Sequence, residues 1–144
     1  MSTITTLSKE DDCYGYPGTV SRFARYDSAS AYRDDGPNGE PQVNPVWFDY
    51  DGEHVKFSQT KTRQKYKNVQ RDERIALSIV DPANPFRYIE VRGRVDQIEA
   101  DPDNAFINKM AKKYMDQDVY PFNRPEDERI VLYVKPEHTT QMGT

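Results

Sequence analysis

The sequence is organised around residues 57–74, FSQTKTRQKYKNVQRDER, where a predicted strand leads into a short basic helix. The strand is indicated by the alternating run His54 to Ser58. The helix is indicated by Tyr66 and Val69, whose spacing of three residues places them on one helical face. We therefore predict that a strand enters a helix near Thr60.

This segment is basic within an acidic chain. Six Lys and Arg and two acidic residues give it a charge of +4, whereas the chain carries −4, so the remainder sums to −8. Cations in the first turn oppose the helix dipole, which favours anions there by about 0.3–1 kcal/mol. Lys61, Arg63 and Lys65 are therefore poorly placed for stability alone, but they are well placed to bind an anion at the helix N-terminus.

Nearby hydroxyl groups favour phosphate as that anion. Ser58, Thr60 and Thr62 provide neutral hydrogen-bond donors beside the cations. The alternative is a solvated basic face, which is the ordinary role of a charge run. Both interpretations stay open at this point.

Length and composition limit the class of protein. A chain of 144 residues is one domain's worth, and only 35% of it is hydrophobic, although ten Tyr and six Phe add large buried area. Such a lean core favours an obligate homodimer. The single cysteine, Cys13, excludes an internal disulfide. We expect a cytoplasmic protein that binds neither membranes nor nucleic acid, because it lacks a long apolar run and a signal peptide and has a pI near 5.2.

Turn signals divide the chain. Residues 1–38 are predicted to be an irregular lead with one strand at most, and residues 39–144 to be the folded domain. Asn38-Gly39 predicts a hairpin turn. Asp51-Gly52 predicts a second hairpin, which joins a strand over residues 42–48 to the run that begins at His54.

Further strands follow the basic helix. Residues 75–80 predict a strand buried on both faces, and residues 81–85 predict a turn. Residues 89–96 alternate between apolar and charged side chains, which predicts a half-buried strand. Within it, Gly93 predicts a bulge or a close backbone approach.

The C-terminal third predicts one helix and one strand. Asp101-Pro102 is a helix start signal, and apolar residues recur at helical spacing over residues 106–114, which predicts a helix that covers the core. Residues 130–134 predict a last strand that ends at Pro136. The whole order is mainly β (α+β) and predicts an antiparallel barrel of about six strands with two or more short helices.

Several chemistries have no support in the sequence. The histidines His54 and His138 lie on separate elements without ligands at metal-binding spacing, so we predict no metal site. Phosphate-binding glycine loops and nucleophile elbows are absent, and Cys13 has no activating neighbour. The catalytic residues stay unknown, and a bound cofactor would have to supply the chemistry.

Eight motifs occur in order between residues 39 and 93. They are Gly39-Glu40-Pro41-Gln42-Val43-Asn44-Pro45-Val46-Trp47-Phe48, Asp51-Gly52, Phe57-Ser58, Arg63-x-Lys65-x-x-Asn68, Arg71-Asp72-x-Arg74, Asp81-Pro82, Arg87-Tyr88 and Gly93. Together they resemble the pyridoxamine 5′-phosphate oxidase-like split β-barrel flavoproteins, whose barrel binds FMN. The resemblance is closest to the branch that uses the deazaflavin coenzyme F420, and it covers about residues 39–136.

The resemblance implies a homodimer with the cofactor at the subunit interface. Residues 39–144 would form the cofactor-binding split barrel. The implied phosphate-binding residues are Ser58, Thr60, Arg63 and Lys65, with Asn68 fixing the helix. F420 also has a carboxylated tail, and the four candidate cations for it, which are equally well explained as solvated residues, are Lys56, Lys61, Lys67 and Arg71. The implied ring contacts are Gln42, Asn44, Pro45 and Trp47, and Trp47 is equally well explained as a core residue. Pro85 to Tyr88 would approach from a neighbouring strand or from the other subunit.

The chain departs from the family pattern before its first motif. Residues 24–33 are polar where the family has an apolar strand, and residues 34–38 resemble an insertion. Position 73 is Glu where the family often has Pro.

The leading hypothesis is an F420-dependent oxidoreductase that transfers a hydride between reduced F420 and a small organic acceptor. One alternative is an FMN-binding flavoprotein of the same fold. A second is a protein that binds F420 or flavin without turnover. A third is a protein whose basic segment docks an acidic partner.

Overall fold

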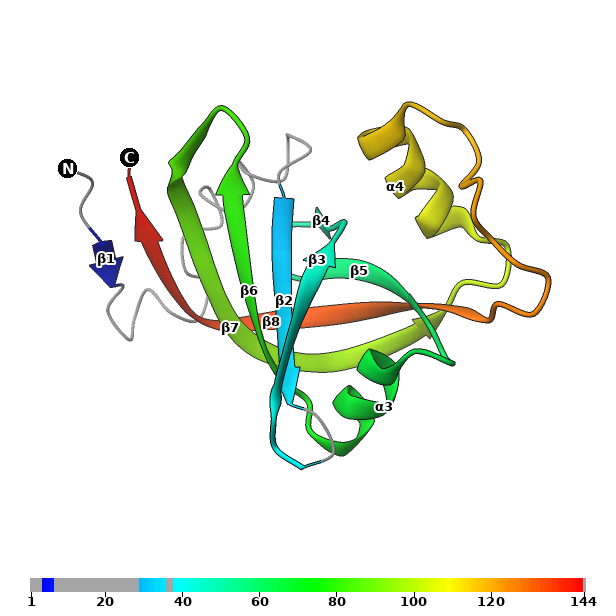
Figure 1. The fold of residues 1–144 in the computed structure, drawn as a ribbon, viewed down its shortest axis with the longest axis horizontal. Coiled ribbons are helices and arrows are strands. Elements are labelled where there is room, and N and C mark those ends of the chain that lie inside the picture. The colour runs from blue at the N-terminus through cyan, green and yellow to red at the C-terminus, as the bar shows by residue number, and fades with distance from the viewer. Residues whose placement is uncertain (1–3, 7–28, 36–37, 144) are drawn as a thin grey trace.

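The computed structural model describes residues 4–6, 29–35 and 38–143, and its strands form one antiparallel sheet (Figure 1). The strands are β1 (Ile4–Thr6), β2 (Ala29–Asp35), β3 (Pro41–Val46), β4 (Asp49–Tyr50), β5 (Val55–Thr60), β6 (Arg74–Asp81), β7 (Asn84–Ala100) and β8 (Arg129–Met142). The helices are α3 (Gln64–Arg71) and α4 (Ala105–Met115).

The sheet is an open, split barrel. Its strand order is β3-β2-β6-β7-β8-β5-β4, with β1 also paired to β8. Within the part of the chain that the structure describes, the end strands β3 and β4 do not pair with each other. Two of the eight described strands, β1 and β4, have only three and two residues. The predicted fold class and its six principal strands are therefore confirmed.

Part of the predicted irregular lead belongs to the sheet. Residues 29–35 form β2, which pairs with both β3 and β6. The prediction allowed one strand at most in residues 1–38, and it is wrong in this respect because both β1 and β2 lie there. Pairing on both edges makes a strand of the polar sequence of β2, whose β-propensity is weak. Residues 7–28, which include Cys13, lie outside the described residues, and for them the prediction stays a prediction.

Both predicted glycine turns are present. Asn38-Gly39 lies in the connection between β2 and β3, and Gly39 has a φ of 79°. Gly52, with a φ of 97°, lies between the paired strands β4 and β5. The predicted strand over residues 42–48 is instead divided, because β3 pairs with β2 and the chain turns at Trp47 before β4 begins.

The strand pair β6 and β7 follows the predicted alternation. Ile75, Leu77 and Ile79 of β6 are buried, whereas the residues between them are only partly buried, so β6 is covered on one face rather than two. In β7, Ile89 and Val91 are buried and charged residues alternate with them. The turn between the strands is tight, because the residues at its two ends pair with each other.

Gly93 lies at a bulge, as predicted. The register of β7 against β8 shifts between Arg92 and Gly93, and Gly93 faces Pro136. This pairing explains why the last strand does not end at Pro136, as the sequence predicted, but continues to Met142. Proline has no N–H to donate, and the irregular ladder at a bulge tolerates that loss.

The main core lies within the curled sheet and is closed by α3. Its buried side chains include Phe48, Phe57 and Leu77. Val69 of α3 joins them with 4% of its surface exposed, and Tyr66 packs against the cluster, as their spacing predicted. The buried residues of α4 are absent from this cluster, so the prediction that α4 covers the core is wrong.

Helix α4 packs instead against the corner between β3 and β4. The Tyr114 ring stacks on Trp47 with centroids 5.2 Å apart, and Lys113 Nζ donates to the Phe48 carbonyl at 2.8 Å. The helix begins at Ala105 rather than at Pro102, although the Asp101 carboxylate accepts a hydrogen bond from the Phe106 N–H at 3.1 Å. Asp101 was predicted to be the N-cap residue. It does cap the helix, but it lies three residues before the observed N-cap residue, Asn104.

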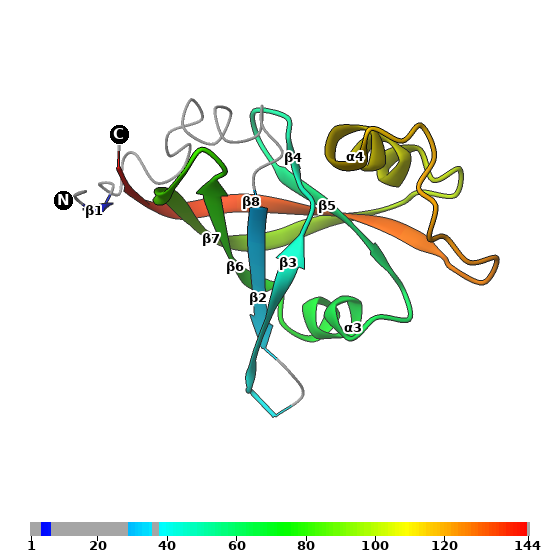
Figure 2. The same cartoon turned by 45° about the horizontal axis from the view of Figure 1, so that its top comes forward.

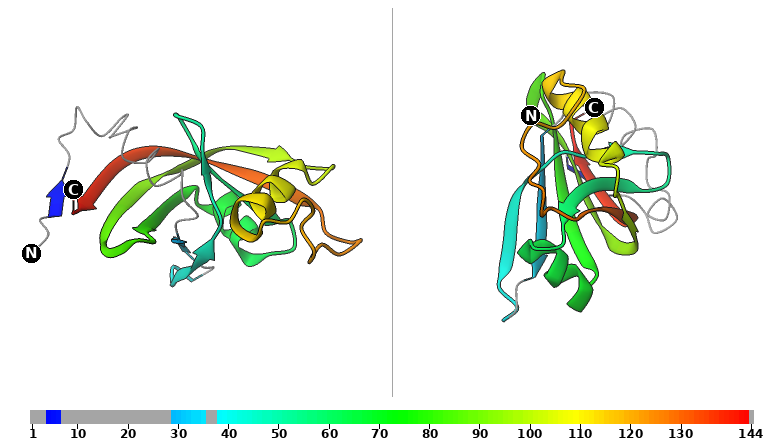
Figure 3. Two further views of the ribbon diagram at one scale, coloured as in Figure 1. Left: turned by 90° about the horizontal axis from the view of Figure 1, so that it is seen from above. Right: turned by 90° about the vertical axis from the view of Figure 1, so that its right-hand side faces the viewer.

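The two helices lie on opposite sides of the strands that separate them (Figure 2). In the side view, α4 lies at the top and α3 at the bottom, with strands of the sheet between them (Figure 3, right). No helix in the described part of the chain is long and apolar enough to cross a membrane.

Candidate functional site

The site begins where β5 leaves the sheet. The Lys61 N–H donates to the Glu128 carbonyl at 3.1 Å, which extends the β5–β8 ladder by one residue. The chain then turns, with the Arg63 N–H donating to the Thr60 carbonyl at 3.1 Å. Helix α3 therefore begins at Gln64, four residues later than predicted, because the β5–β8 pairing outlasts the strand pattern.

The first turn of α3 is suited to an anion. Arg63 is the N-cap residue and makes no side-chain cap, and the first turn contains no acidic residue. Lys65 lies in this turn with only 7% of its surface exposed. Because Lys61 and Arg63 precede the helix, only Lys65 directly opposes its dipole, and the other two cations flank its N-terminus.

Two adjoining cavities open beside this turn. The larger, of about 450 Å³, is lined by residues that include Thr60, Thr62, Arg63, Tyr120, Arg124 and Arg129. The smaller, of about 250 Å³, is lined by residues that include Pro45, Trp47, Ser58, Arg63, Lys65 and Arg129. Gln59, Arg63, Tyr120 and Arg129 line both cavities, so we treat the two as one site and call it the basic cavity.

An aromatic array forms one wall of the basic cavity. Trp47 lies between Tyr114, on which it stacks, and Tyr120, whose ring meets it edge-on at 5.9 Å. Phe122 packs edge-on against Tyr120 with centroids 5.6 Å apart and is 65% exposed. A cationic turn beside an aromatic wall fits a ligand that has an anionic group and a planar ring.

Arg129, the first residue of β8, lies opposite Thr60 in the strand register. Its Nε donates to Asn123 Oδ1 at 2.7 Å, and its Nη1 donates to Ser58 Oγ at 3.3 Å. Its guanidinium carbon also lies 4.9 Å from the centroid of the Tyr120 ring. These contacts hold the guanidinium between β5 and the loop after α4 that contains Tyr120, Phe122 and Asn123, which we call the aromatic loop.

Six of the predicted cofactor-binding residues line the basic cavity. They are Pro45, Trp47, Ser58, Thr60, Arg63 and Lys65. Trp47 packs on Tyr114 of α4 and lines the cavity, but it is only partly buried and does not belong to the main core cluster. Asn68 is fully buried and accepts a hydrogen bond from Gln64 Nε2 at 2.8 Å, so it stabilises α3 without lining the cavity.

Lys61 lines a third cavity rather than the basic cavity. This cavity, of about 420 Å³, shares Arg124, Asp127 and Arg129 with the larger part of the basic cavity. Lys61 Nζ lies 3.2 Å from Glu128 Oε2, although both side chains remain largely exposed. Lys61 therefore lies beside the site, in a neighbouring cavity.

Four predicted residues remain, which are Gln42, Asn44, Pro85 and Tyr88. Pro85 and Tyr88 lie at the start of β7 and line none of the three cavities. Their predicted approach from the other subunit stays a prediction. Gln42 and Asn44 lie in β3 opposite residues of β2, and their predicted ring contacts also stay predictions.

The sequence reading missed Arg129, Arg124 and Tyr120 as site residues. Arg124 and Tyr120 belong to the loop after α4, and the only sequence signal was its run of aromatic residues. Arg129 could have been found from the β5–β8 pairing, which places it opposite Thr60.

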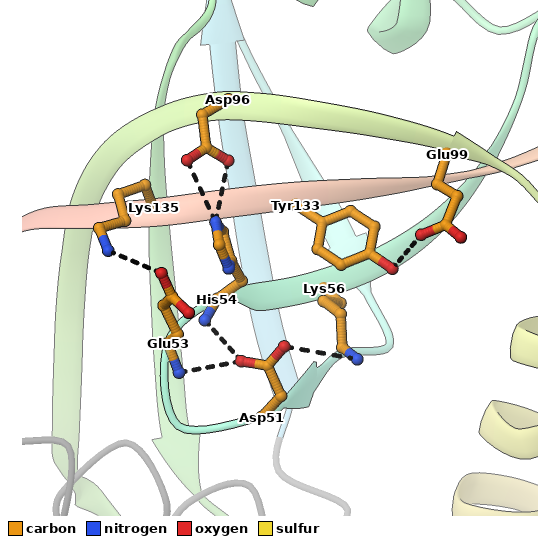
Figure 4. A network of polar contacts seen from close by, with 8 residues as sticks. All are labelled: Asp51, Glu53, His54, Lys56, Asp96, Glu99, Tyr133 and Lys135. Atoms are coloured by element: carbon orange, nitrogen blue, oxygen red, sulfur yellow. Dashed lines mark hydrogen bonds and ion pairs between the residues drawn. The ribbon is translucent and has the colours of Figure 1, made fainter.

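A second cluster of titratable groups lies farther along β5, β7 and β8 (Figure 4). His54 Nε2 lies 3.0 Å from Asp96 Oδ1, and Lys56 Nζ lies 3.7 Å from Asp51 Oδ2. Tyr133 donates its hydroxyl proton to Glu99. These groups satisfy one another, which is typical of a structural network rather than of a ligand site.

The Tyr133 hydrogen bond predicts a loss of stability at high pH. The bond to Glu99, with a smaller effect of burial, raises the pKa of Tyr133 from 10.0 to about 12. Because the folded-state pKa is the higher one, the contribution of Tyr133 is complete below pH 10 and is lost as the pH rises towards 12. The stability advantage of the wild type over Tyr133→Phe should shrink across this window. Urea unfolding at several pH values tests this, and a difference independent of pH would contradict it.

The fold and the basic cavity define a class of protein, the split β-barrels that bind flavin-type cofactors. Residues 34–143 match the pyridoxamine 5′-phosphate oxidase family. This match covers most of the chain, so the protein belongs to that family of flavin- and deazaflavin-related oxidoreductases. No curated protein matches the chain.

One solved structure supports the same assignment, and others share the fold. An F420 reductase is 35% identical, with a TM-score of 0.75, and the match covers 83% of this chain and 94% of that one. General stress protein 26 of Bacillus anthracis has the same fold with a TM-score of 0.64 and 17% identity, over 85% of this chain and 90% of that one. A conserved hypothetical protein of Mycobacterium tuberculosis has a TM-score of 0.67 and 16% identity, over 92% and 88% of the two chains.

Proposed function

We propose that this protein is an F420-dependent oxidoreductase that acts as a homodimer and transfers a hydride between reduced F420 and a small organic acceptor. The observation that carries the proposal is the basic cavity, where Arg63, Lys65 and Arg129 lie beside the aromatic wall formed by Trp47 and Tyr120. The 35% identity to an F420 reductase over 83% of the chain supports this cofactor.

The residues of the basic cavity fit such a cofactor. Arg63 and Lys65 would hold its phosphate at the N-terminus of α3, where charge-assisted hydrogen bonds are strongest. Trp47 and Tyr120 would limit the position of the ring and exclude water from one side of it. F420, when bound, supplies the hydride chemistry, so the protein needs to contribute mainly binding and orientation.

The third cavity favours F420 over FMN. F420 has a carboxylated tail in addition to its phosphate, whereas FMN has the phosphate alone. Of the four cations considered for that tail, only Lys61 lines a cavity that adjoins the basic cavity, and Arg124 lies there with it. Lys56, Lys67 and Arg71 line none of the three cavities.

FMN is the second candidate, because the matched family is that of pyridoxamine 5′-phosphate oxidase. Trp47, the only tryptophan, lines the basic cavity, so its fluorescence reports on binding there. Parallel titrations with F420 and with FMN should show tighter binding of F420. Preference for FMN would favour a flavoprotein, and binding of neither would overturn the proposal.

Turnover is tested separately from binding. The protein should oxidise reduced F420 when candidate organic acceptors are added, and the rate should scale with protein concentration. Tight binding without oxidation by any acceptor would favour a protein that holds the cofactor without turnover. Sedimentation of the purified protein tests the proposed homodimer.

A further inference from the structure

We propose that Arg129 is a third phosphate-binding cation of the basic cavity and that Ser58 and Asn123 are positioning residues that fix its guanidinium. This inference rests on the proposed function, because it assumes a cofactor with a phosphate group. It assigns a role to Arg129, which lies more than fifty residues beyond the basic segment. It also changes the predicted role of Ser58 from a phosphate-binding residue to a positioning residue.

Arg129 forms no ion pair with any described residue, although Asp127 lines two of the same cavities. Among the residues that the structure describes, no carboxylate lies within ion-pair distance of its guanidinium. The two acidic residues that precede Arg129 are engaged elsewhere, because Asp127 Oδ2 accepts from the Arg124 N–H at 3.0 Å and Glu128 pairs with Lys61. Both partners of Arg129, Asn123 and Ser58, are neutral.

The guanidinium also keeps donors for a ligand. Of its five N–H groups, the Nε–H is used by Asn123 and one Nη1–H by Ser58, which leaves three on Nη1 and Nη2. Arg129 lines each of the three cavities, including both parts of the basic cavity. A fork of free N–H groups matches two phosphate oxygens, a geometry that Lys cannot supply.

The contacts of Arg129 with neutral groups position its guanidinium. Asn123, Ser58 and the Tyr120 ring restrain the guanidinium without taking its charge, so little rotamer entropy is lost when an anion binds. If Arg129 only linked β5 to the aromatic loop, we would expect it to pair with a carboxylate. Asp127, two residues away in the sequence, could have been that partner. We therefore infer that Ser58 acts through Arg129.

The test uses the full chain and Trp47 fluorescence with F420 and FMN as probes. Arg129→Met should weaken the binding of the preferred cofactor about 10- to 100-fold. Arg129→Lys should recover little of this loss, because a point charge cannot replace the fork. Arg92→Met is the matched control and should bind as the wild type does, since Arg92 is exposed, pairs with Glu90 at 3.0 Å and lines none of the cavities.

A double-mutant cycle tests the positioning role. Ser58→Ala and Asn123→Ala should each weaken binding several-fold in the wild type and have almost no further effect in Arg129→Met. Equal losses in both backgrounds would show direct ligand contacts and overturn the positioning role. Thermal unfolding of every variant separates weak binding from misfolding.

Two results distinguish this inference from the proposed function. If the wild type binds a cofactor and Arg129→Met binds it equally well, the role of Arg129 is overturned and the proposed function stands. If the folded wild type binds neither cofactor, the proposed function is overturned and this inference with it.

Discussion

Replacing Arg63 by Ala together with Lys65 by Met should weaken cofactor binding by about 3–6 kcal/mol, since each charge-assisted contact contributes about 1.5–3 kcal/mol. Such a loss is more than a hundredfold in the dissociation constant. Met is chosen at position 65 because the lysine stem is buried, with 7% of the residue exposed, and its packing has to be kept. Fluorescence titration with F420 and with FMN measures the effect.

The matched control for the double variant is Lys67→Met. Lys67 belongs to the same helix, is exposed and lines none of the three cavities, so the same loss of charge should leave binding nearly unchanged. An equal loss in this control would mean that the helix attracts the cofactor only through its overall charge. Unchanged binding in the double variant would overturn the assignment of the phosphate site.

Gly93→Ala should destabilise the protein by about 3 kcal/mol or more, at or above the upper end of ordinary overpacking. A Cβ at this position would lie 2.1 Å from the Lys135 carbonyl oxygen and 3.2 Å from the Pro136 Cα. Both are backbone atoms, so no side-chain rotation relieves the clash, and β7 or β8 has to move. Urea unfolding measures the loss of free energy.

Gly52→Ala provides the comparison for Gly93. A Cβ on Gly52 would meet no atom within 4 Å, and its φ of 97° is the only source of strain. We expect a loss of about 1–2 kcal/mol there. Similar losses at both glycines would show that the close approach to Lys135 relaxes easily.

The predictable parts of the fold are those in which the local sequence shows which face of a strand or helix is buried and which is exposed. In β7, the alternation around Ile89 and Val91 determined the register, since a slip of one residue would expose the whole apolar set. The same reasoning gave Tyr66 and Val69 as the buried face of α3. Arg63 and Lys65 were found because cations at a helix N-terminus need an explanation.

The unpredicted parts depend on pairings between distant segments. Residues 29–35 form a strand because β3 and β6 flank them, and β8 passes Pro136 because Gly93 lies opposite. Arg129 enters the site only through the pairing of β8 with β5, and its contact with Ser58 spans 71 residues of sequence. Local propensity carries no information about such partners.

The long connection between β7 and β8 leaves and re-enters the sheet at one point, because the Asp101 N–H donates to the Arg129 carbonyl at 3.0 Å. Between these residues lie α4 and much of the cavity lining, including Tyr120 and Arg124. Since the two ends are pinned together, this segment can change in length or sequence without shifting the strand register. The segment between Asp101 and Arg129 can therefore be replaced as a unit, in evolution or by design. Such a replacement would change the shape of the cavity and leave the barrel unchanged.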